Sequence, residues 1–212
     1  MNVLALNSGS SSVKFAAYRT RAGEPELCFA GESGAIAATV STAPLVAEIR
    51  ARAATARISL DAIGHRIVHG GALLRQPCLI DDRVLEQLDA AAAFAPVHAA
   101  PALALLGATR EGFPGVPQVA CFDTGFHATM PLAASTLPVD RVLARDGIQR
   151  YGFHGLSCES IVRQLGADLP DRVVIAHLGH GCSVTAVRAG HSVDTTMGLT
   201  PSGGVIMGTR SG

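Results

Sequence analysis

Lysine is almost absent from this chain of 212 residues, and so are aromatic side chains and any excess of charge. Lys14 is the single lysine, tryptophan is missing, and the aromatic fraction is 4%. The 17 basic residues balance the 17 acidic ones, so the chain has no electrostatic footprint for nucleic acid or for an anionic membrane. A hydrophobic fraction of 48% indicates a globular protein with an aliphatic core. We therefore expect neither nucleic acid nor a membrane among its partners.

The chain also lacks any C-x-x-C pair; its five cysteines are Cys28, Cys78, Cys121, Cys158 and Cys182. An odd, scattered set argues against disulfides and zinc and favours reduced thiols in the cytoplasm. The apolar N-terminal run is too short for a signal peptide and has no basic residues before it. Residues 90–109 carry no Asp, Glu, Lys or Arg, but Pro96 and Pro101 interrupt them, so we expect a buried soluble segment there.

The one lysine closes a turn rich in glycine and serine. Residues 7–14 read Asn-Ser-Gly-Ser-Ser-Ser-Val-Lys and follow the apolar segment 3–6. Small residues let backbone N–H groups approach an anion, hydroxyls donate hydrogen bonds and an ammonium adds a point charge, so the turn suits phosphate. The Walker loop is absent, and the S-x-x-K match at 11–14 lacks the second lysine that class A β-lactamases need. A plain serine-rich hairpin turn remains the alternative.

The same arrangement returns late in the chain. We expect a buried strand at 173–176, a turn of glycine and histidine at 177–183, and a second strand at 184–188. The echo indicates two related halves, each opening with a strand, a phosphate-type turn and a strand. Helix and strand patterns alternate between the two, which argues for an α/β fold with a mixed sheet. We place the domain boundary at the proline-containing link near 128–131, giving domains 1–128 and 129–212.

Hydrophobic periodicity and capping residues predict the elements in between. Thr42 and Pro44 precede one helical pattern, and Asp81-Asp82 open another. We expect a broken helix near 99–112 and a helix that starts after Gly155 and runs to about Leu165. Strands are expected at 13–18, 63–68 and 119–122.

Two histidines four residues apart, His65 and His69, are spaced like zinc ligands on a helix. Arg66 stands where the general base of such a site would be, and the β-branched neighbours favour a strand, so zinc is disfavoured. We interpret Arg66 as an arginine at a strand end, beside glycines that let a substrate approach.

Asp123, His154 and Arg210 supply the remaining chemistry. Asp123 ends a buried strand, where a carboxylate often holds Mg²⁺, and a turn-capping role is the equal alternative. His154 lies between glycines before a helix and could steady an anion; a buried, hydrogen-bonded histidine is the alternative. A glycine-rich tail leads to Arg210. Lysine, arginine, aspartate and histidine at turns and strand ends are the parts that phosphoryl transfer requires.

Taken in order, these motifs resemble those of the acetate kinase family of acyl-phosphate-forming kinases. The matching segments are 7–14, 65–71, 96–98, 122–127, 151–155, 177–181, 194–198 and 208–210. The resemblance implies the duplicated ribonuclease-H-like fold of sugar kinases, Hsp70-type chaperones and actin, with helices flanking a mixed sheet and the second domain truncated. It also implies ATP with Mg²⁺ or Mn²⁺, a short carboxylate such as acetate or propionate, and a homodimer of the complete protein.

The resemblance also implies roles for individual residues. Arg66 and Arg210 would bind the carboxylate and the in-flight phosphoryl group, with His154 on its equatorial oxygens. Asp123 would position Mg²⁺ and the reactants, and Asn7 would contact phosphate and, weakly, Mg²⁺. The implied phosphate loops contain Ser10, Ser12 and Lys14 in the first half and His177, Gly179, His180 and Gly181 in the second. The implied pocket for the substrate methyl group contains Val68, Val97, Phe153 and Pro201.

The chain departs from the family pattern at several positions. His180 and Ala99 stand where the family usually has asparagine, Cys158 where it has a histidine, and Ser202-Gly203 where it has Leu-Glu. Family chains are much longer, and the part without a match here includes the adenosine-binding loop and a Mg²⁺-associated glutamate. Two hypotheses therefore stay open. One is a piece of an acetate kinase that is inactive alone, and the other is a non-catalytic binding or regulatory remnant of the same fold.

Overall fold

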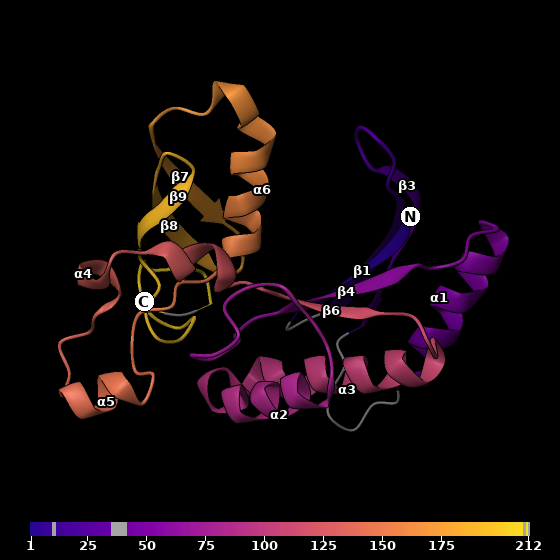
Figure 1. The fold of residues 1–212 in the computed structure, drawn as a ribbon, viewed down its shortest axis with the longest axis horizontal. Coiled ribbons are helices and arrows are strands. Elements are labelled where there is room, and N and C mark those ends of the chain that lie inside the picture. Colours follow the sequence, from indigo (N-terminus) through magenta and orange to yellow (C-terminus); the bar gives the residue numbers. More distant parts are fainter. Residues whose placement is uncertain (10–11, 35–41, 210, 212) are drawn as a thin grey trace. The chain divides into compact units, whose positions relative to one another are not determined.

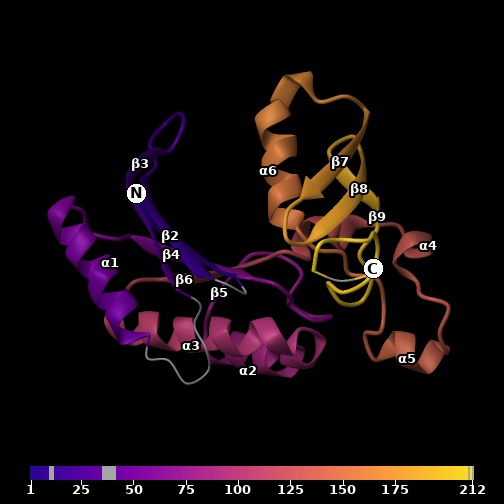
Figure 2. The same ribbon diagram turned by 180° about the vertical axis from the view of Figure 1, so that it is seen from behind.

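The structure is a computed structural model that describes residues 1–9, 12–34, 42–209 and 211 (Figure 1; seen from behind in Figure 2). It divides into two compact units. Unit 1 contains Met1–Ile67 and Pro77–Cys121, and unit 2 contains Val68–Gln76 and Phe122–Gly212. The boundary between the units therefore lies between Cys121 and Phe122, a few residues before position 128, and the earlier segment Val68–Gln76 belongs to unit 2. Domains 1–128 and 129–212 remain a prediction about the family fold.

Unit 1 is built on a six-stranded mixed sheet with the order β3-β2-β1-β4-β6-β5. The first three strands, β1 (Asn2–Ser8), β2 (Ser12–Arg19) and β3 (Glu26–Gly34), are antiparallel neighbours. β4 (Ala62–Ile67) then pairs parallel with β1, and β6 (Gln118–Phe122) and β5 (Cys78–Leu79) follow. The predicted strands β1, β2, β4 and β6 are confirmed, whereas β3 and β5 were not predicted.

Side chains alternate between the two faces of this sheet. Leu4 and Leu6 of β1 are buried, while Ala5 and Asn7 are exposed on the opposite face. Helices α1 (Ala43–Thr55) and α3 (Pro96–Gly112) pack on the buried face. The core they enclose includes Leu4, Leu6, Val13, Phe15, Leu45, Ile49, Ile63 and Leu105.

The helices of unit 1 begin at residues suited to helix starts. Pro44 lies in the first turn of α1, and the Asp81 carboxylate accepts a hydrogen bond from the Val84 N–H at 2.8 Å, which caps α2 (Asp82–Ala91). The expected break inside 99–112 is wrong, because α3 runs unbroken through Pro101. A proline in the second turn removes only one backbone bond there, and the chain bends earlier, at η1 (Ala92–Phe94) and Ala95. Within the described ranges, the helices are all too short or too polar to cross a membrane.

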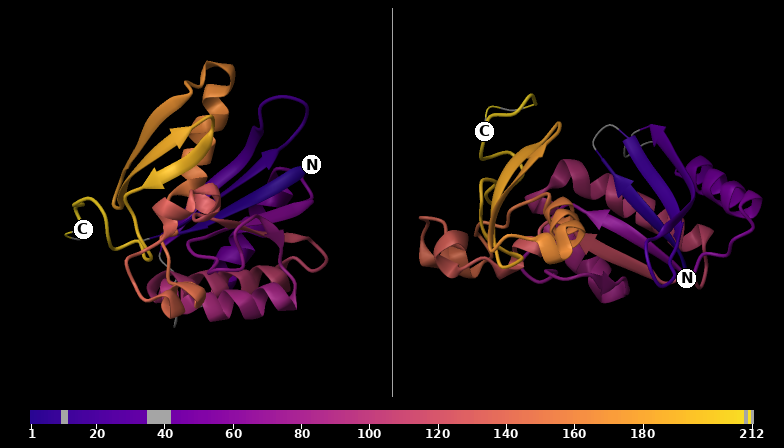
Figure 3. Two further views of the ribbon diagram at one scale, coloured as in Figure 1. Left: turned by 60° about the vertical axis from the view of Figure 1, so that its left-hand side comes forward. Right: turned by 90° about the horizontal axis from the view of Figure 1, so that it is seen from above.

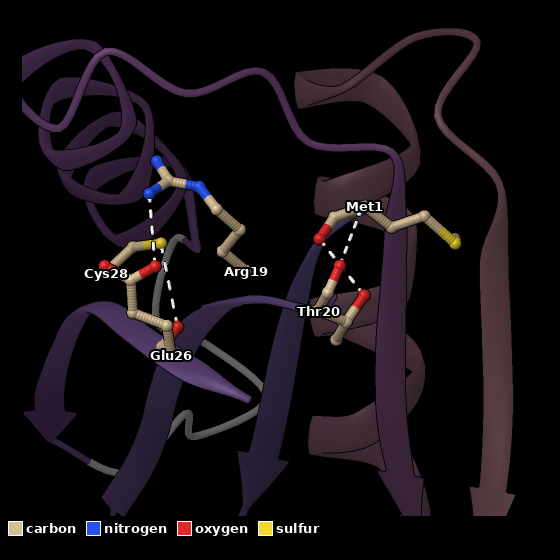
Figure 4. A network of polar contacts seen from close by, with 5 residues as sticks. All are labelled: Met1, Arg19, Thr20, Glu26 and Cys28. Atoms are coloured by element: carbon tan, nitrogen blue, oxygen red, sulfur yellow. Dashed lines mark hydrogen bonds and ion pairs between the residues drawn. The ribbon is translucent and has the colours of Figure 1, made fainter. Parts of the chain in front are cut away.

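Polar contacts hold the far end of the β1–β2–β3 meander (Figure 4). The N-terminal ammonium donates to the Thr20 carbonyl at 3.1 Å, and the Thr20 N–H donates to the Met1 carbonyl at 2.7 Å. Arg19 pairs with Glu26 at 3.3 Å, and the Cys28 thiol lies 3.8 Å from the Glu26 carbonyl oxygen. These contacts secure the strand register, and that register determines which side chains stand opposite one another at the turn end.

Unit 2 contains a three-stranded antiparallel sheet with one long helix on it (Figure 3). The strands are β7 (Arg172–Leu178), β8 (Cys182–Arg188) and β9 (His191–Thr195), and the helix is α6 (Gly155–Leu165). Cys158 of α6 packs on Ile175 and Val187. The predicted ends of α6 and the strands β7 and β8 are confirmed. The elements η2 (Gly125–Thr129), α4 (Leu132–Ser135), α5 (Arg141–Arg145), η3 (Gly166–Asp168) and β9 were not predicted.

The segment Val68–Gln76 is part of the packing of unit 2. The His69 ring meets the rings of Tyr151 and Phe153 edge-on, with centroids 4.4 and 5.5 Å away. The Arg75 guanidinium donates to the Ala128 carbonyl at 3.3 Å. The packing of unit 2 therefore includes a segment, Val68–Gln76, that lies well before Phe122 in the sequence.

Candidate active site

Three of the predicted phosphate and substrate residues form one row across unit 1. Asn7 stands opposite Lys14 of β2 on one side and opposite Arg66 of β4 on the other. The Arg66 guanidinium donates to the Asn7 side-chain oxygen at 3.0 Å. The row lies on the face of the sheet opposite the core, since Leu6 and His65 alternate with it toward the interior. An amide between an ammonium and a guanidinium is suited to binding an anion.

The row has a fourth member that the sequence did not reveal. Glu32 of β3 is the register partner of Lys14 and is exposed like it. Because β3 was not predicted, nothing in the sequence placed this carboxylate beside the lysine. Ser12 opens β2 at the turn, where the Gly9 N–H donates to the Ser12 carbonyl at 2.8 Å. Ser10 lies outside the described residues.

Asp123 and His154 are joined through the main chain of unit 2. The Gly155 N–H, next to His154, donates to the Asp123 carbonyl at 2.8 Å. A side chain at position 155 would collide with that same carbonyl oxygen, so glycine is required. Asp123 is 3% exposed and directly follows β6, at the strand end where the sequence placed it. A main-chain hydrogen bond thus ties the backbone at the carboxylate residue to the backbone next to the imidazole residue, although the two are far apart in sequence.

His154 has an unusual backbone and stacks on a second predicted residue. Its φ of 60° lies in the left-handed region, which non-glycine residues rarely adopt. Its ring stacks on the His177 ring with centroids 4.0 Å apart and planes 15° apart. Nδ1 of His154 lies 2.9 Å from Ser183 Oγ, and Nδ1 of His177 lies 3.1 Å from Ser157 Oγ. Neither serine was a candidate from the sequence.

His127 supports the loop that presents His154. It is fully buried, its Nε2 lies 2.9 Å from the Phe153 carbonyl oxygen, and its Nδ1 lies 2.9 Å from Ser192 Oγ. Since a carbonyl can only accept, Nε2 carries the proton and Nδ1 accepts from the hydroxyl. Burial lowers the pKa of His127, opposed by the bond to Phe153. A side chain at Gly152 would collide with the His127 ring, so this position also needs glycine.

The second predicted phosphate turn joins β7 to β8. His177 lies in β7, and the Gly179 N–H donates to the Gly181 carbonyl at 3.0 Å. The Thr209 hydroxyl donates to the His180 carbonyl at 2.8 Å, which ties the segment before Arg210 to this turn. Arg210 itself lies outside the described residues.

The predicted methyl-pocket residues are divided between the units. Val68, Phe153 and Pro201 belong to unit 2, and Phe153 is 1% exposed against the His69 ring. Val97 belongs to unit 1, where it is 75% exposed. The pocket remains a prediction.

The two histidines with metal-like spacing make internal bonds instead. His65 Nε2 lies 2.7 Å from Gln118 Oε1, and His69 Nδ1 accepts from the Gly71 N–H at 2.8 Å. Burial lowers the pKa of His65 and of His69 to about 4 in each case, against the opposing effect of a hydrogen bond. In the part of the chain that the structure describes, no three His, Cys, Asp or Glu side chains group as metal ligands. One carboxylate, Asp123, fits Mg²⁺ that takes its other ligands from water and phosphate.

Comparison with known proteins identifies the family. The model of the acetokinase family matches residues 31–212. The chain belongs to the acetokinase family. An acetate kinase from Shewanella loihica is 42% identical over 238 aligned residues, covering 99% of this chain and 60% of that protein. A propionate kinase from Yersinia enterocolitica is 42% identical over 241 residues, covering 99% of this chain and 57% of that protein.

Solved structures of the family agree with the fold. The acetate kinase of Entamoeba histolytica has a TM-score of 0.85 at 26% identity, covering all of this chain and 59% of that one. The propionate kinase of Francisella tularensis has a TM-score of 0.84 at 34% identity, covering all of this chain and 61% of that one. The predicted α/β fold with a mixed sheet flanked by helices is confirmed, and so is the resemblance. The chain spans about 60% of the length of such relatives.

Proposed function

We propose that the protein containing this chain is a carboxylate kinase that transfers the γ-phosphoryl group of ATP to acetate or propionate, reversibly. The products are ADP and an acyl phosphate. The observation that carries the proposal is the bond between the Gly155 N–H and the Asp123 main-chain carbonyl, which holds the backbone of a carboxylate residue next to that of His154. The names of the acetate and propionate kinase relatives support the choice of acid.

The reaction needs positioning and charge stabilisation more than covalent chemistry from the protein. A carboxylate oxygen attacks the γ-phosphorus while the bond to the bridging oxygen of ADP breaks, and charge spreads over three equatorial oxygens. Arg66 and Arg210 would bind the acid and the moving group, and His154 would donate a hydrogen bond to an equatorial oxygen. The remaining phosphate contacts would come from Asn7, Ser10, Ser12, Lys14, His177, Gly179, His180 and Gly181.

A divalent ion and a small pocket complete the proposal. Mg²⁺ or Mn²⁺, when bound, neutralises phosphate charge, and Asp123 with Asn7 would help to hold it because their oxygens are the ligands it prefers. Val68, Val97, Phe153 and Pro201 would contact the methyl group of the acid. We further propose that the complete protein is a cytoplasmic homodimer.

The test is acyl-phosphate formation, trapped as the hydroxamate, by the natural protein that carries this sequence. We expect product with acetate and with propionate, and a loss of nearly all of it in Asp123→Asn. Asp89→Asn is the matched control, since it makes the same change at an exposed residue of α2. No product from the unmodified protein would contradict the proposal.

The departures at His180 and Cys158 favour one alternative, a non-catalytic binding or regulatory protein of the same fold. The Cys158 sulfur makes a long contact of 3.7 Å to Thr185 Oγ1 where the resemblance places an imidazole. ATP binding without turnover by the complete protein would be the signature of that alternative.

A further inference from the structure

His154 is held in a strained conformation by contacts on both of its sides. A left-handed non-glycine residue persists only where the surroundings over-determine it, and such residues gather at functional sites. Before it, the Phe153 carbonyl is bonded to His127, and after it, the Gly155 N–H is bonded to Asp123. The backbone of His154 is thus fixed, and the remaining freedom is the rotation and the tautomer of its ring.

Ser183 restrains the rotation of that ring. It is fully buried in β8, and its Oγ lies 2.9 Å from Nδ1 of His154. When the hydroxyl donates to Nδ1, the ring proton must sit on Nε2. An N–H on Nε2 is the donor that a phosphoryl oxygen needs, whereas the other tautomer would present a lone pair to it.

The second imidazole is tied in the same way from the opposite element. His177 of β7 is the register partner of Ser183, and its Nδ1 lies 3.1 Å from Ser157 on α6, three residues after His154. Each histidine is therefore held by a serine that neighbours the other histidine. The rings stack with centroids 4.0 Å apart, so a rotation of one would displace the other.

We propose that Ser183 and Ser157 are positioning residues for the phosphoryl-transfer site. They engage both Nδ1 atoms of the stacked His154–His177 pair, and in this proposal the Ser183 hydroxyl donates to Nδ1 of His154, which puts the ring proton on Nε2. This inference rests on the proposed kinase function for its role in turnover, while the tautomer it assigns does not depend on that function.

The test compares variants of the natural protein that carries this sequence. Ser183→Ala should lower kcat by about 10- to 100-fold with KM for ATP and acid nearly unchanged, since misplacement of a group at the reacting centre costs on this scale. Ser183→Thr keeps the hydroxyl and should retain more activity than Ser183→Ala. Ser160→Ala is the control on α6, because Ser160 is exposed and its hydroxyl accepts a hydrogen bond from the Gln164 side-chain amide at 2.9 Å.

NMR of isotope-labelled histidine nitrogens supplies a readout that a packing role would not move. In the unmodified protein at alkaline pH, His154 should show a protonated Nε2, and Ser183→Ala should show a mixture of tautomers. Unchanged kcat in Ser183→Ala would overturn the proposal. A lower kcat with the tautomer unchanged would also overturn it, because the loss would then come from general destabilisation. If the unmodified protein forms no acyl phosphate, only the kinase function is refuted. The NMR comparison would still test whether Ser183 donates to Nδ1 of His154.

Discussion

The β1–β2 hairpin of unit 1 and the β7–β8 hairpin of unit 2 share one backbone plan and carry different chemistry. In both, a glycine at the start of the turn donates its N–H to a carbonyl across the turn. The Gly9 N–H donates to the Ser12 carbonyl at 2.8 Å, and the Gly179 N–H donates to the Gly181 carbonyl at 3.0 Å. In both, a third antiparallel strand follows with a single register shift. The residues that face each other near the turn are Asn7 and Lys14 in one and His177 and Ser183 in the other.

This difference separates two kinds of anion contact. The first hairpin offers a lysine ammonium, a point charge that can only donate hydrogen bonds, and the hairpin pairs with the strand that carries Arg66. The second offers imidazoles and hydroxyls, whose hydrogen-bonding direction depends on tautomer and protonation. A duplicated strand–turn–strand template can therefore supply fixed charge from one copy and orientable donors from the other.

The hairpins differ again at their outer edges. β1 pairs with β4 on its second edge, whereas β7 has no second partner among the strands of residues 1–9, 12–34, 42–209 and 211. Val174 and Leu178 of β7 are 67% and 78% exposed.

The largest effect we predict follows from this contrast. Purified residues 1–212 should form no acyl phosphate above background, because phosphoryl transfer relies on complete positioning of the reactants. Robust turnover in the hydroxamate assay would contradict this.

Removing either of the two predicted arginine charges should have the next largest effect. In the complete protein, Arg66→Ala and Arg210→Ala should each lower kcat by about three decades, as expected for an arginine that stabilises transition-state charge. Steady-state kinetics of both substrates provide the measurement. A raised KM with kcat unchanged would mean that these arginines only bind the ground state.

Acid should distinguish the units by their buried histidines. His69 and His127 of unit 2 have lowered pKa values, as does His65 of unit 1. Between pH 6.5 and about 4, His65 and His69 are protonated in the unfolded chain but neutral in the folded chain. The free energy of unfolding is therefore highest above pH 6.5 and falls as the pH decreases toward about 4. At pH 5 each of His65 and His69 should cost on the order of 2 kcal/mol.

Hydrogen exchange followed by mass spectrometry should therefore show unit 2 opening more readily than unit 1 on acidification from neutral pH. His127→Gln is the diagnostic variant, since an amide can still donate to the Phe153 carbonyl and cannot titrate. Equal protection of both units across this range would contradict the assignment.

Substrate preference should respond more weakly. Val97 has one methylene fewer than leucine, so the complete protein should use propionate well relative to acetate, and Val97→Leu should shift the preference toward acetate. The change should stay within about 1–3 kcal/mol, the scale of one methylene in an apolar pocket. The measurement is the ratio of kcat/KM for the two acids in both variants. An unchanged ratio would show that Val97 does not line the substrate pocket.

The smallest effect should come from His180 in the second turn. Its carbonyl, not its ring, accepts the bond from Thr209, and backbone N–H groups do most of the phosphate binding in such turns. His180→Asn should leave ATP affinity nearly unchanged or slightly improved in a calorimetric titration. A clear loss of affinity would show that the imidazole has its own contact.

The sequence was informative wherever the determining interactions are local. The start of α6 follows from glycine and histidine at 152–155, and β1, β2 and β6 follow from short apolar runs. β9 and β3 escaped prediction because their residues are polar or mixed, and only pairing with a neighbouring strand makes them extended.

In the candidate site, too, the sequence reveals the features that depend on local residues and misses those that depend on long-range pairing. Residue types at turns identified Asn7, Lys14, Arg66, Asp123 and His154 as candidates. The supporting bonds join residues far apart in sequence, 29 positions for His154 and Ser183 and 65 for His127 and Ser192. No periodicity encodes such pairs, so Ser183, Ser192 and the buried role of His127 became visible only in the folded chain.

The placement of Val68–Gln76 has a consequence for synthesis on the ribosome. This segment leaves the exit tunnel long before Phe122, yet its packing partners Tyr151 and Phe153 are translated later still. The nascent chain must keep an apolar loop unsatisfied while the strands on either side of it fold, a period in which such surface is prone to aggregation. An expression fragment that starts at 122 would lack the loop altogether, so unit 2 cannot be produced as one continuous stretch of the gene.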